Sequence, residues 1–160
     1  MLKRSLVILV VILAIPAFAK SGDTPEEIIQ QKHSIIMEKI KSIDAATLKS
    51  WIENKKDFIL LDVREPNEIN AVKITAENRM EISRGVVDLK FPRLVPDKEA
   101  TVVIVCSHGF RSAAVTDLIS EYGYKNLYNL KDGVFAWINA GYRVANVYGT
   151  FEVKEFQSKF

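Results

Sequence analysis

Short apolar runs that alternate with helical segments are the feature that most restricts the fold of this chain. Phe58–Val63 and Thr101–Val105 are apolar almost throughout, as strands buried on both faces of a sheet are. Asn126–Leu130 predicts a further strand, and Ile43 a short one. Helices are expected at residues 45–54, 112–122 and 133–140. This order favours an α/β domain whose mostly parallel central sheet is flanked by helices on both faces.

An extra helix is expected before this domain. Thr24 and Glu27 form a capping box, with Pro25 at the first helical position, and isoleucines recur at helical spacing to about residue 41. We favour a helix that packs on the following domain over a dimerisation helix. The expected organisation is an N-terminal helical extension at residues 20–41, a main domain at 42–145 and a C-terminal tail at 146–160.

The first 19 residues have the features of an export signal. A basic start precedes an apolar run of ten residues at Leu6–Ile15, and Ala17-Phe18-Ala19 offers small residues for cleavage. The run is too short to span a bilayer, which takes about 20 residues. We therefore expect a signal peptide at residues 1–19 and an exported protein, in a bacterial periplasm. The membrane would be a partner only through an uncleaved signal.

Charge and cysteine content restrict the function. The signal holds two basic residues and no acidic one, so the 22 basic and 20 acidic side chains of the chain balance without it. Net charge therefore gives no support to a nucleic-acid partner. Cys106 is the only cysteine and there are two histidines, so neither an internal disulfide nor a zinc site is expected. Cys106 is either a buried structural thiol or one kept for its reactivity.

The loop Cys106-Ser107-His108-Gly109-Phe110-Arg111-Ser112 joins a predicted buried strand to a predicted helix. Ligands of parallel sheets bind at the carboxyl ends of strands, and the N–H groups of a tight loop and a helix start can hold an anion. Gly109 permits a positive φ. Arg111 either braces the loop or meets an anionic substrate. These features predict a stabilised thiolate at Cys106.

Taken together, the motifs of the chain resemble those of the rhodanese family. Residues 106–112 are similar to its Cys-x-x-Gly-x-Arg-Ser active-site loop, and Leu61–Glu65 followed by Glu68 resembles its Asp-Val-Arg…Glu signature. Further similar segments are Ile82–Gly85, Gly123–Leu130, Gly133, Trp137 and Gly141-Tyr142. The resemblance covers about residues 42–145.

The resemblance implies a sulfurtransferase with Cys106 as the catalytic residue. Its thiolate would take a sulfane sulfur from thiosulfate or polysulfide as a persulfide and pass it to a thiol, cyanide or a protein acceptor. Ser107, His108, Gly109, Phe110, Arg111 and Ser112 would form the substrate-binding loop. Sulfur itself does this chemistry, so no cofactor and no metal are implied.

Several individual roles stay open. His108 either contacts substrate or faces solvent, and Phe110 either lines the mouth of the site or covers the core. Asp62 and Arg64 are expected to support the site structurally, with Arg64 paired to Glu68 four residues on.

One departure from the family pattern leaves alternatives to the enzyme, and the loop length ranks the others. Ser107 stands where many catalytic rhodaneses have a basic residue, which favours a persulfide carrier with little turnover on free donors. A non-catalytic interaction domain is a further alternative, and the intact set of Cys106, Gly109 and Arg111 argues against it. Cysteine phosphatases have one more residue in the loop than the four between Cys106 and Arg111. We therefore rank phosphatase and arsenate reductase below sulfur transfer.

Overall fold

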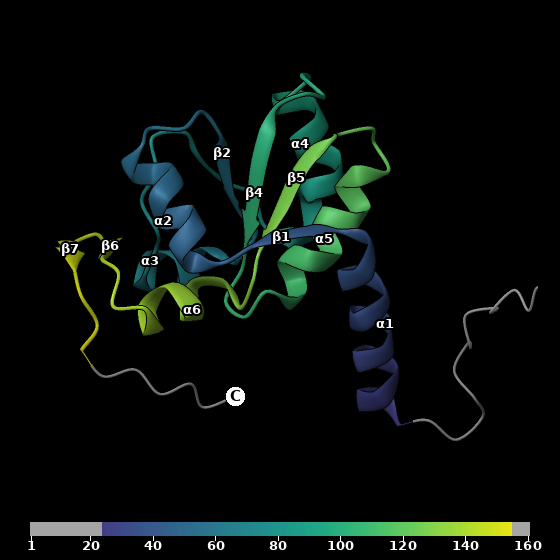
Figure 1. The fold of residues 1–160 in the computed structure, drawn as a ribbon, viewed down its shortest axis with the longest axis horizontal. Coiled ribbons are helices and arrows are strands. Elements are labelled where there is room, and N and C mark those ends of the chain that lie inside the picture. Colours follow the sequence, from purple (N-terminus) through teal and green to yellow (C-terminus); the bar gives the residue numbers. More distant parts are fainter. Residues whose placement is uncertain (1–23, 155–160) are drawn as a thin grey trace, which may run out of the picture.

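The computed structural model describes residues 24–154, so the predicted signal peptide at 1–19 lies outside the described residues. Its centre is a parallel five-stranded sheet with the strand order β1-β5-β4-β2-β3 (Figure 1). The strands are β1 Lys41–Ile43, β2 Ile59–Asp62, β3 Arg79–Glu81, β4 Thr101–Val105 and β5 Asn126–Leu130. The expected α/β architecture with a parallel sheet is confirmed.

Helices cover both faces of this sheet, as predicted (Figure 1). One face packs against α2 and α6, and the other against α4 and α5. The helices are α1 Pro25–Lys39, α2 Ala45–Glu53, α3 Pro66–Ala71, the 3-10 turn η1 Arg84–Val86, α4 Val87–Leu94, α5 Phe110–Ser120 and α6 Gly133–Asn139. None of the helices within residues 24–154 is long and apolar enough to cross a membrane.

The central strand β4 shows why its apolar run forms a strand. Val102 and Ile104 pack into the core under α4 and α5, whereas Val103 and Val105 pack into the core under α2 and α6. All four side chains are fully buried. Burying each such side chain contributes about 1.5–3 kcal/mol to folding. Hydrophobic burial on both faces therefore fixes β4 in the middle of the sheet, and with it the position of the loop that follows.

The N-terminal helix α1 forms with the predicted capping box: Glu27 N–H donates to Thr24 Oγ1, and Thr24 N–H donates to Glu27 Oε2. The helix lies against α5, as expected for a helix that packs on the domain, but buries no residue fully. Figure 1 shows that its amino-terminal half extends beyond the rest of the fold. Its contact with the domain is therefore made by its carboxyl-terminal half.

Several elements were not expected. These are α3, β3, α4 and a hairpin of β6 Val144–Asn146 and β7 Gly149–Phe151. In addition, α5 begins at Phe110 rather than at residue 112. The first turn of α5 thus holds Arg111 and Ser112, so the helix starts directly beside Cys106.

Candidate active site at the carboxyl end of β4

Cys106 follows β4 directly, and its side chain is only 1% exposed. Two backbone N–H groups donate to its Sγ, that of Gly109 at 3.2 Å and that of Ser112 at 3.4 Å, and the hydroxyl oxygen of Ser112 lies 3.4 Å away. The N–H groups in the first turn of a helix have no partner within the helix and are free to bind an anion. The sulfur therefore lies beside backbone donors that can bind an anion.

Two glycines allow the loop to approach its neighbours. Gly109 has a φ of +87°, and a Cβ there would lie 2.9 Å from the backbone nitrogen of Asp132. Gly133 has a φ of +60°, and a Cβ there would lie 2.2 Å from the carbonyl oxygen of Cys106. Any other residue at either position would strain the backbone and displace the loop.

The first turn of α6 holds the carbonyl groups of the loop. Val134 N–H donates to Cys106 O at 2.8 Å, and Phe135 N–H donates to Ser107 O at 3.1 Å. These bonds fix the orientation of two successive peptide groups. Because α6 binds these two carbonyl groups, they do not compete with Sγ for the N–H groups of Gly109 and Ser112.

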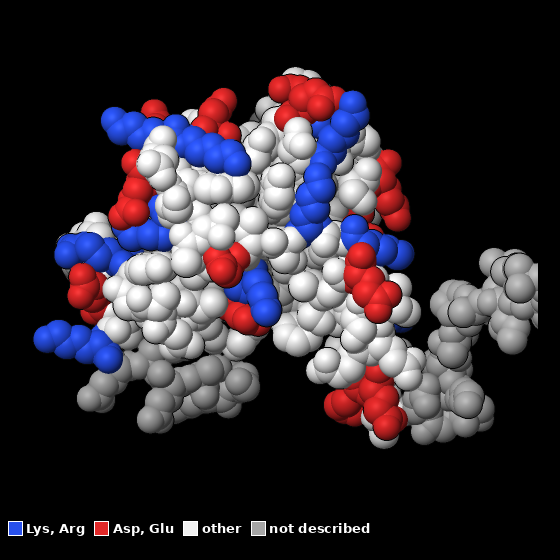
Figure 2. All heavy atoms as spheres, in the orientation of Figure 1, with Lys and Arg blue, Asp and Glu red and all other residues white. Residues whose placement is uncertain are grey.

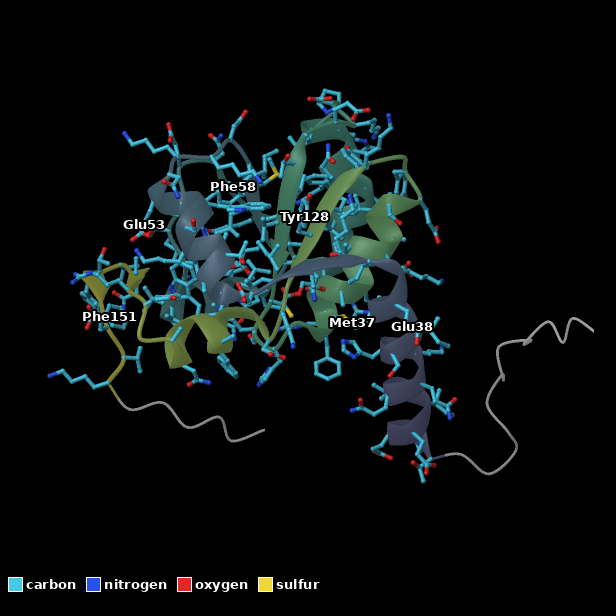
Figure 3. All side chains as sticks on the ribbon, in the orientation of Figure 1. Met37, Glu38, Glu53, Phe58, Tyr128 and Phe151 are labelled. Carbon is cyan, nitrogen blue, oxygen red and sulfur yellow. The ribbon has the colours of Figure 1, made fainter. Side chains whose placement is uncertain are left out.

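Ser112 is itself fixed by a buried residue that the sequence analysis did not identify. Ser112 Oγ lies 2.6 Å from Asn129 Oδ1, and both residues are buried. Asn129 Nδ2 lies 3.9 Å from the Sδ of Met37, which points from α1 toward α5 and β5 (Figure 3). An asparagine in the middle of a predicted strand, between Tyr128 and Leu130, was the signal that could have revealed it, since buried polar groups need partners.

Arg111 braces the loop through Glu68 of α3. Its Nη1 and Nη2 donate to the two carboxylate oxygens of Glu68 at 2.7 and 2.6 Å, and Ser107 Oγ donates to Glu68 Oε1 at 2.7 Å. The side chains of Glu68 and Arg111 are 28% and 32% exposed. The hydrogen bonds from Arg111 lower the pKa of Glu68 to about 2, and partial burial opposes this only in part. The same bonds raise the pKa of Arg111 further above its usual range.

The predicted ion pair between Arg64 and Glu68 is wrong. Arg64 instead binds Asp62, with Nε to Oδ1 at 2.9 Å and Nη2 to Oδ2 at 2.7 Å, and both side chains are 1% exposed. Arg79 Nη2 also donates to Asp62 Oδ2 at 2.8 Å. Arg64 precedes α3, which begins at Pro66, so the helical i,i+4 relation to Glu68 does not apply. Asp62 and Arg64 thus support the end of β2 and do not line the pocket described next.

A pocket of about 310 Å³ opens beside Cys106 and is lined by Cys106, His108, Phe110 and Arg111. His108 and Phe110, whose roles the sequence left open, both line this pocket. The ring of His108 packs edge-on against Phe135 at 4.2 Å. Phe110 is 43% exposed and stacks on His33 of α1 at 4.1 Å. No local pattern in the sequence predicts the contact between His33 and Phe110.

A larger cavity of about 720 Å³ lies at the opposite end of the sheet. Its lining includes residues at the amino ends of β2 and β4, such as Ile59 and Thr101. Ligands of parallel α/β sheets bind at the carboxyl ends of the strands. The smaller pocket beside Cys106 is therefore the candidate active site. Within residues 24–154, no group of three or more His, Cys, Asp or Glu side chains could hold a metal ion.

The sheet and the loop between β4 and α5 define the class of protein. The rhodanese-like domain family matches residues 44–140, and the chain belongs to this family.

Three individual proteins illustrate the similarity of the chain to this family. A Bacillus subtilis (strain 168) protein named "Putative sulfurtransferase YtwF" is 36% identical over 98 residues, which are 61% of this chain and 90% of the relative. A sulfurtransferase of Allochromatium vinosum is 26% identical over 102 residues, 64% of this chain and 92% of the relative. A rhodanese-related protein of Thermoplasma volcanium is 34% identical, with a TM-score of 0.56 over 66% of this chain and 97% of that structure.

A fourth comparison concerns the fold alone. The polysulfide-sulfur transferase homodimer of Wolinella succinogenes matches 89% of this chain and 100% of its own, with a TM-score of 0.63 and 22% identity.

Proposed function

We propose that this protein is a sulfurtransferase that moves a sulfane sulfur from thiosulfate or polysulfide to a thiophilic acceptor through a persulfide on Cys106. The observation that carries the proposal is the pair of backbone N–H groups, from Gly109 and Ser112, that donate to Sγ at 3.2 and 3.4 Å. Such donors stabilise a thiolate before transfer and a persulfide anion after it. Membership of the rhodanese-like family supports the same chemistry.

The reaction has two half-reactions. The thiolate of Cys106 attacks the outer sulfur of thiosulfate, the sulfur–sulfur bond of the donor breaks, and sulfite leaves with the electron pair. A nucleophilic acceptor, either a thiol or cyanide, then attacks the outer sulfur of the persulfide. That sulfur leaves with the acceptor as a new persulfide or as thiocyanate, and the Cys106 thiolate is regenerated. Gly109 and Ser112 hold the charge on Sγ in both directions, so neither step needs a general base from the protein.

Intact mass spectrometry tests the proposal. We expect thiosulfate or polysulfide to add the mass of one sulfur atom to the wild type, and cyanide to remove it with release of thiocyanate. The Cys106→Ser variant is the matched control, because it replaces one atom and should not gain sulfur. Sulfur on that variant, or no sulfur on the wild type with either donor, would contradict the proposal and leave a non-catalytic interaction domain.

A persulfide carrier is the second candidate, because Cys106 is 1% exposed and its neighbour Arg111 is neutralised by Glu68. Such a protein would hold the sulfur for a partner and turn over free donors slowly. We expect a carrier to be isolated with sulfur already bound and to give little thiocyanate in steady state. Rapid steady-state turnover of thiosulfate and cyanide would exclude it.

We further propose that the protein is exported to a periplasm through the predicted signal at residues 1–19. Cell fractionation with antibody detection, and N-terminal sequencing of the mature chain, test this. A mature chain that begins after Ala19 would support export. A chain that keeps residues 1–19 in the cytoplasmic fraction would refute it.

A further inference from the structure

The charge of Arg111 is cancelled within the site. Both of its terminal nitrogens bind the carboxylate of Glu68, at 2.7 and 2.6 Å, and the Nη2 nitrogen lies 3.2 Å from Ser107 Oγ. A bidentate pair of this kind is among the strongest of charged hydrogen bonds and fixes the guanidinium plane. Arg111 thus binds chiefly to Glu68 of α3, with a weaker interaction with the Cys106 side chain, and does not offer its full charge to a ligand.

The pocket offers little other countercharge to an anion. Its lining consists of Cys106, His108, Phe110 and Arg111, so Arg111 is its one permanent cation among the residues that the structure describes. Thiosulfate is a dianion, and its leaving group, sulfite, is a dianion too. Holding such a group next to a thiolate requires positive charge, because like charges at a few ångströms repel by several kcal/mol where water is partly excluded.

The rings around the pocket suit a different donor. Phe110 is stacked on His33 at its mouth, and His108 packs on Phe135. Aromatic rings of this kind bind organic groups through their faces and edges. An organic persulfide carries its sulfane sulfur on a carbon-bearing sulfur, and its leaving group is a thiolate with a single charge on sulfur.

We propose that Glu68 sets the donor specificity of this site: by masking Arg111 it selects small organic persulfides over thiosulfate. The proposal rests on the proposed sulfur transfer at Cys106. In the loading step, the Cys106 thiolate attacks the terminal sulfur of the persulfide RS–SH. The RS–SH bond breaks, RS⁻ leaves with its electron pair, and Cys106 becomes the persulfide with the proton retained on the outer sulfur. Glu68 is a positioning residue, since it acts through Arg111.

The test compares kcat/KM for thiosulfate with kcat/KM for cysteine persulfide, using cyanide as the acceptor. The Glu68→Gln variant keeps an oxygen for Arg111 and Ser107 but removes the negative charge. We expect its ratio of thiosulfate to cysteine persulfide to rise about tenfold over the wild type, the scale of one unmasked charge acting on a dianion. Its thiosulfate turnover should also fall more steeply with added salt. A purely structural effect would not produce this salt dependence.

A matched control removes the carboxylate partner of a cation that lies far from the pocket. Glu99 binds Lys125 before β4, at the opposite end of the sheet. The Glu99→Gln variant makes the same change in net charge and should leave the ratio at the wild-type value. An equal rise in this control would overturn the proposal, because net charge alone would then explain the preference.

A second variant tests the proposal if the Glu68→Gln protein does not fold. His108→Lys places a permanent cation on the pocket wall and leaves the Glu68–Arg111 pair intact. We expect the ratio to rise in this variant as well. An unchanged ratio in either folded variant, with Cys106 still loaded, would overturn the specificity proposal and leave sulfur transfer standing. Failure of both donors to load wild-type Cys106 would instead refute the sulfur transfer itself.

Discussion

Two parts of the site differ in burial and in what holds them. The floor consists of buried residues: Ser112, Asn129 and Gly133 hold the Cys106 loop, and Asp62 and Arg64 hold the end of the neighbouring strand β2. The rim consists of partly exposed side chains around the pocket: His33, Glu68, His108, Phe110 and Arg111. Each part contains a bidentate arginine–carboxylate pair, but the floor pair is 1% exposed and the rim pair about 30%.

This difference in burial gives the floor and the rim different roles. A fully buried charge that loses its partner is strongly destabilising, whereas a half-solvated charge is compensated by water. The floor is therefore restricted by stability, and it fixes where the sulfur lies. The rim can vary at low cost in stability, and under the specificity proposal it decides which donor approaches. Figure 2 shows charges of both signs dispersed over the face in view, without a continuous patch of one sign. On this face, no patch of a single sign adds to the effect of local pairs such as that of Glu68.

The largest expected effect is at the floor. Asp62→Asn leaves Arg64 buried without its anion, and we expect the free energy of unfolding to fall by about 3–5 kcal/mol. Glu68→Gln, the same chemical change in the rim, should cost about 1 kcal/mol or less. Urea unfolding of both variants measures the difference. Equal losses would break the distinction between floor and rim.

A second, smaller effect is expected at Gly133. Gly133→Ala should lower the free energy of unfolding by about 1–3 kcal/mol from backbone strain, with more from the contact of its Cβ with Cys106 O. Gly123→Ala is the control, because Gly123 has a φ of +87° but no atom within 4 Å of the added Cβ. Thermal unfolding and sulfur loading are compared in the two variants. A Gly133→Ala protein as stable and as readily loaded as Gly123→Ala would show that the loop tolerates displacement.

The smallest effect is a pH dependence at the rim. The pKa of Glu68 is lowered from its ordinary value of 4.5 to about 2, chiefly by hydrogen bonds from Arg111. Since the folded state holds the carboxylate, the stability from this pair is fully present above pH 4.5 and is lost as the pH falls from 4.5 toward 2. Urea unfolding at several pH values should show that the difference between wild type and Glu68→Gln is constant above pH 4.5 and shrinks below it. A difference that does not change with pH would mean that the pair adds no stability.

The sequence predicted those parts of the fold that hydrophobic burial determines. Strands β2 and β4 are buried on both faces, so their apolar runs identify them. Strand β3 has one apolar residue, Met80, between Arg79 and Glu81, and its pattern is too short to recognise. In α4, Pro92 lies inside the helix and hid it from the pattern.

The sequence predicted the site residues that are close together in the loop, but not the contacts that the loop makes with other elements of the fold. Cys106, Gly109 and Arg111 are close in sequence, and the strand-to-helix turn brings them together. The partner of Glu68 was misassigned because sequence spacing suggested Arg64, whereas the fold brings α3 beside Arg111 from α5. The contact of His33 with Phe110 depends on how α1 docks, which no local rule determines.

The burial of Cys106 affects how readily its thiol is oxidised. An S–S bond is about 2.05 Å long, so a loaded sulfur extends the reactive atom outward by about that distance. Under the proposed sulfur transfer, the empty protein keeps its nucleophile recessed at 1% exposure, and the loaded protein would present an electrophile nearer the surface. In an oxidising compartment, the recess would slow the irreversible oxidation of the resting thiol to sulfinic and sulfonic acids. The outer sulfur, which is replaced at every turnover, would receive that damage instead.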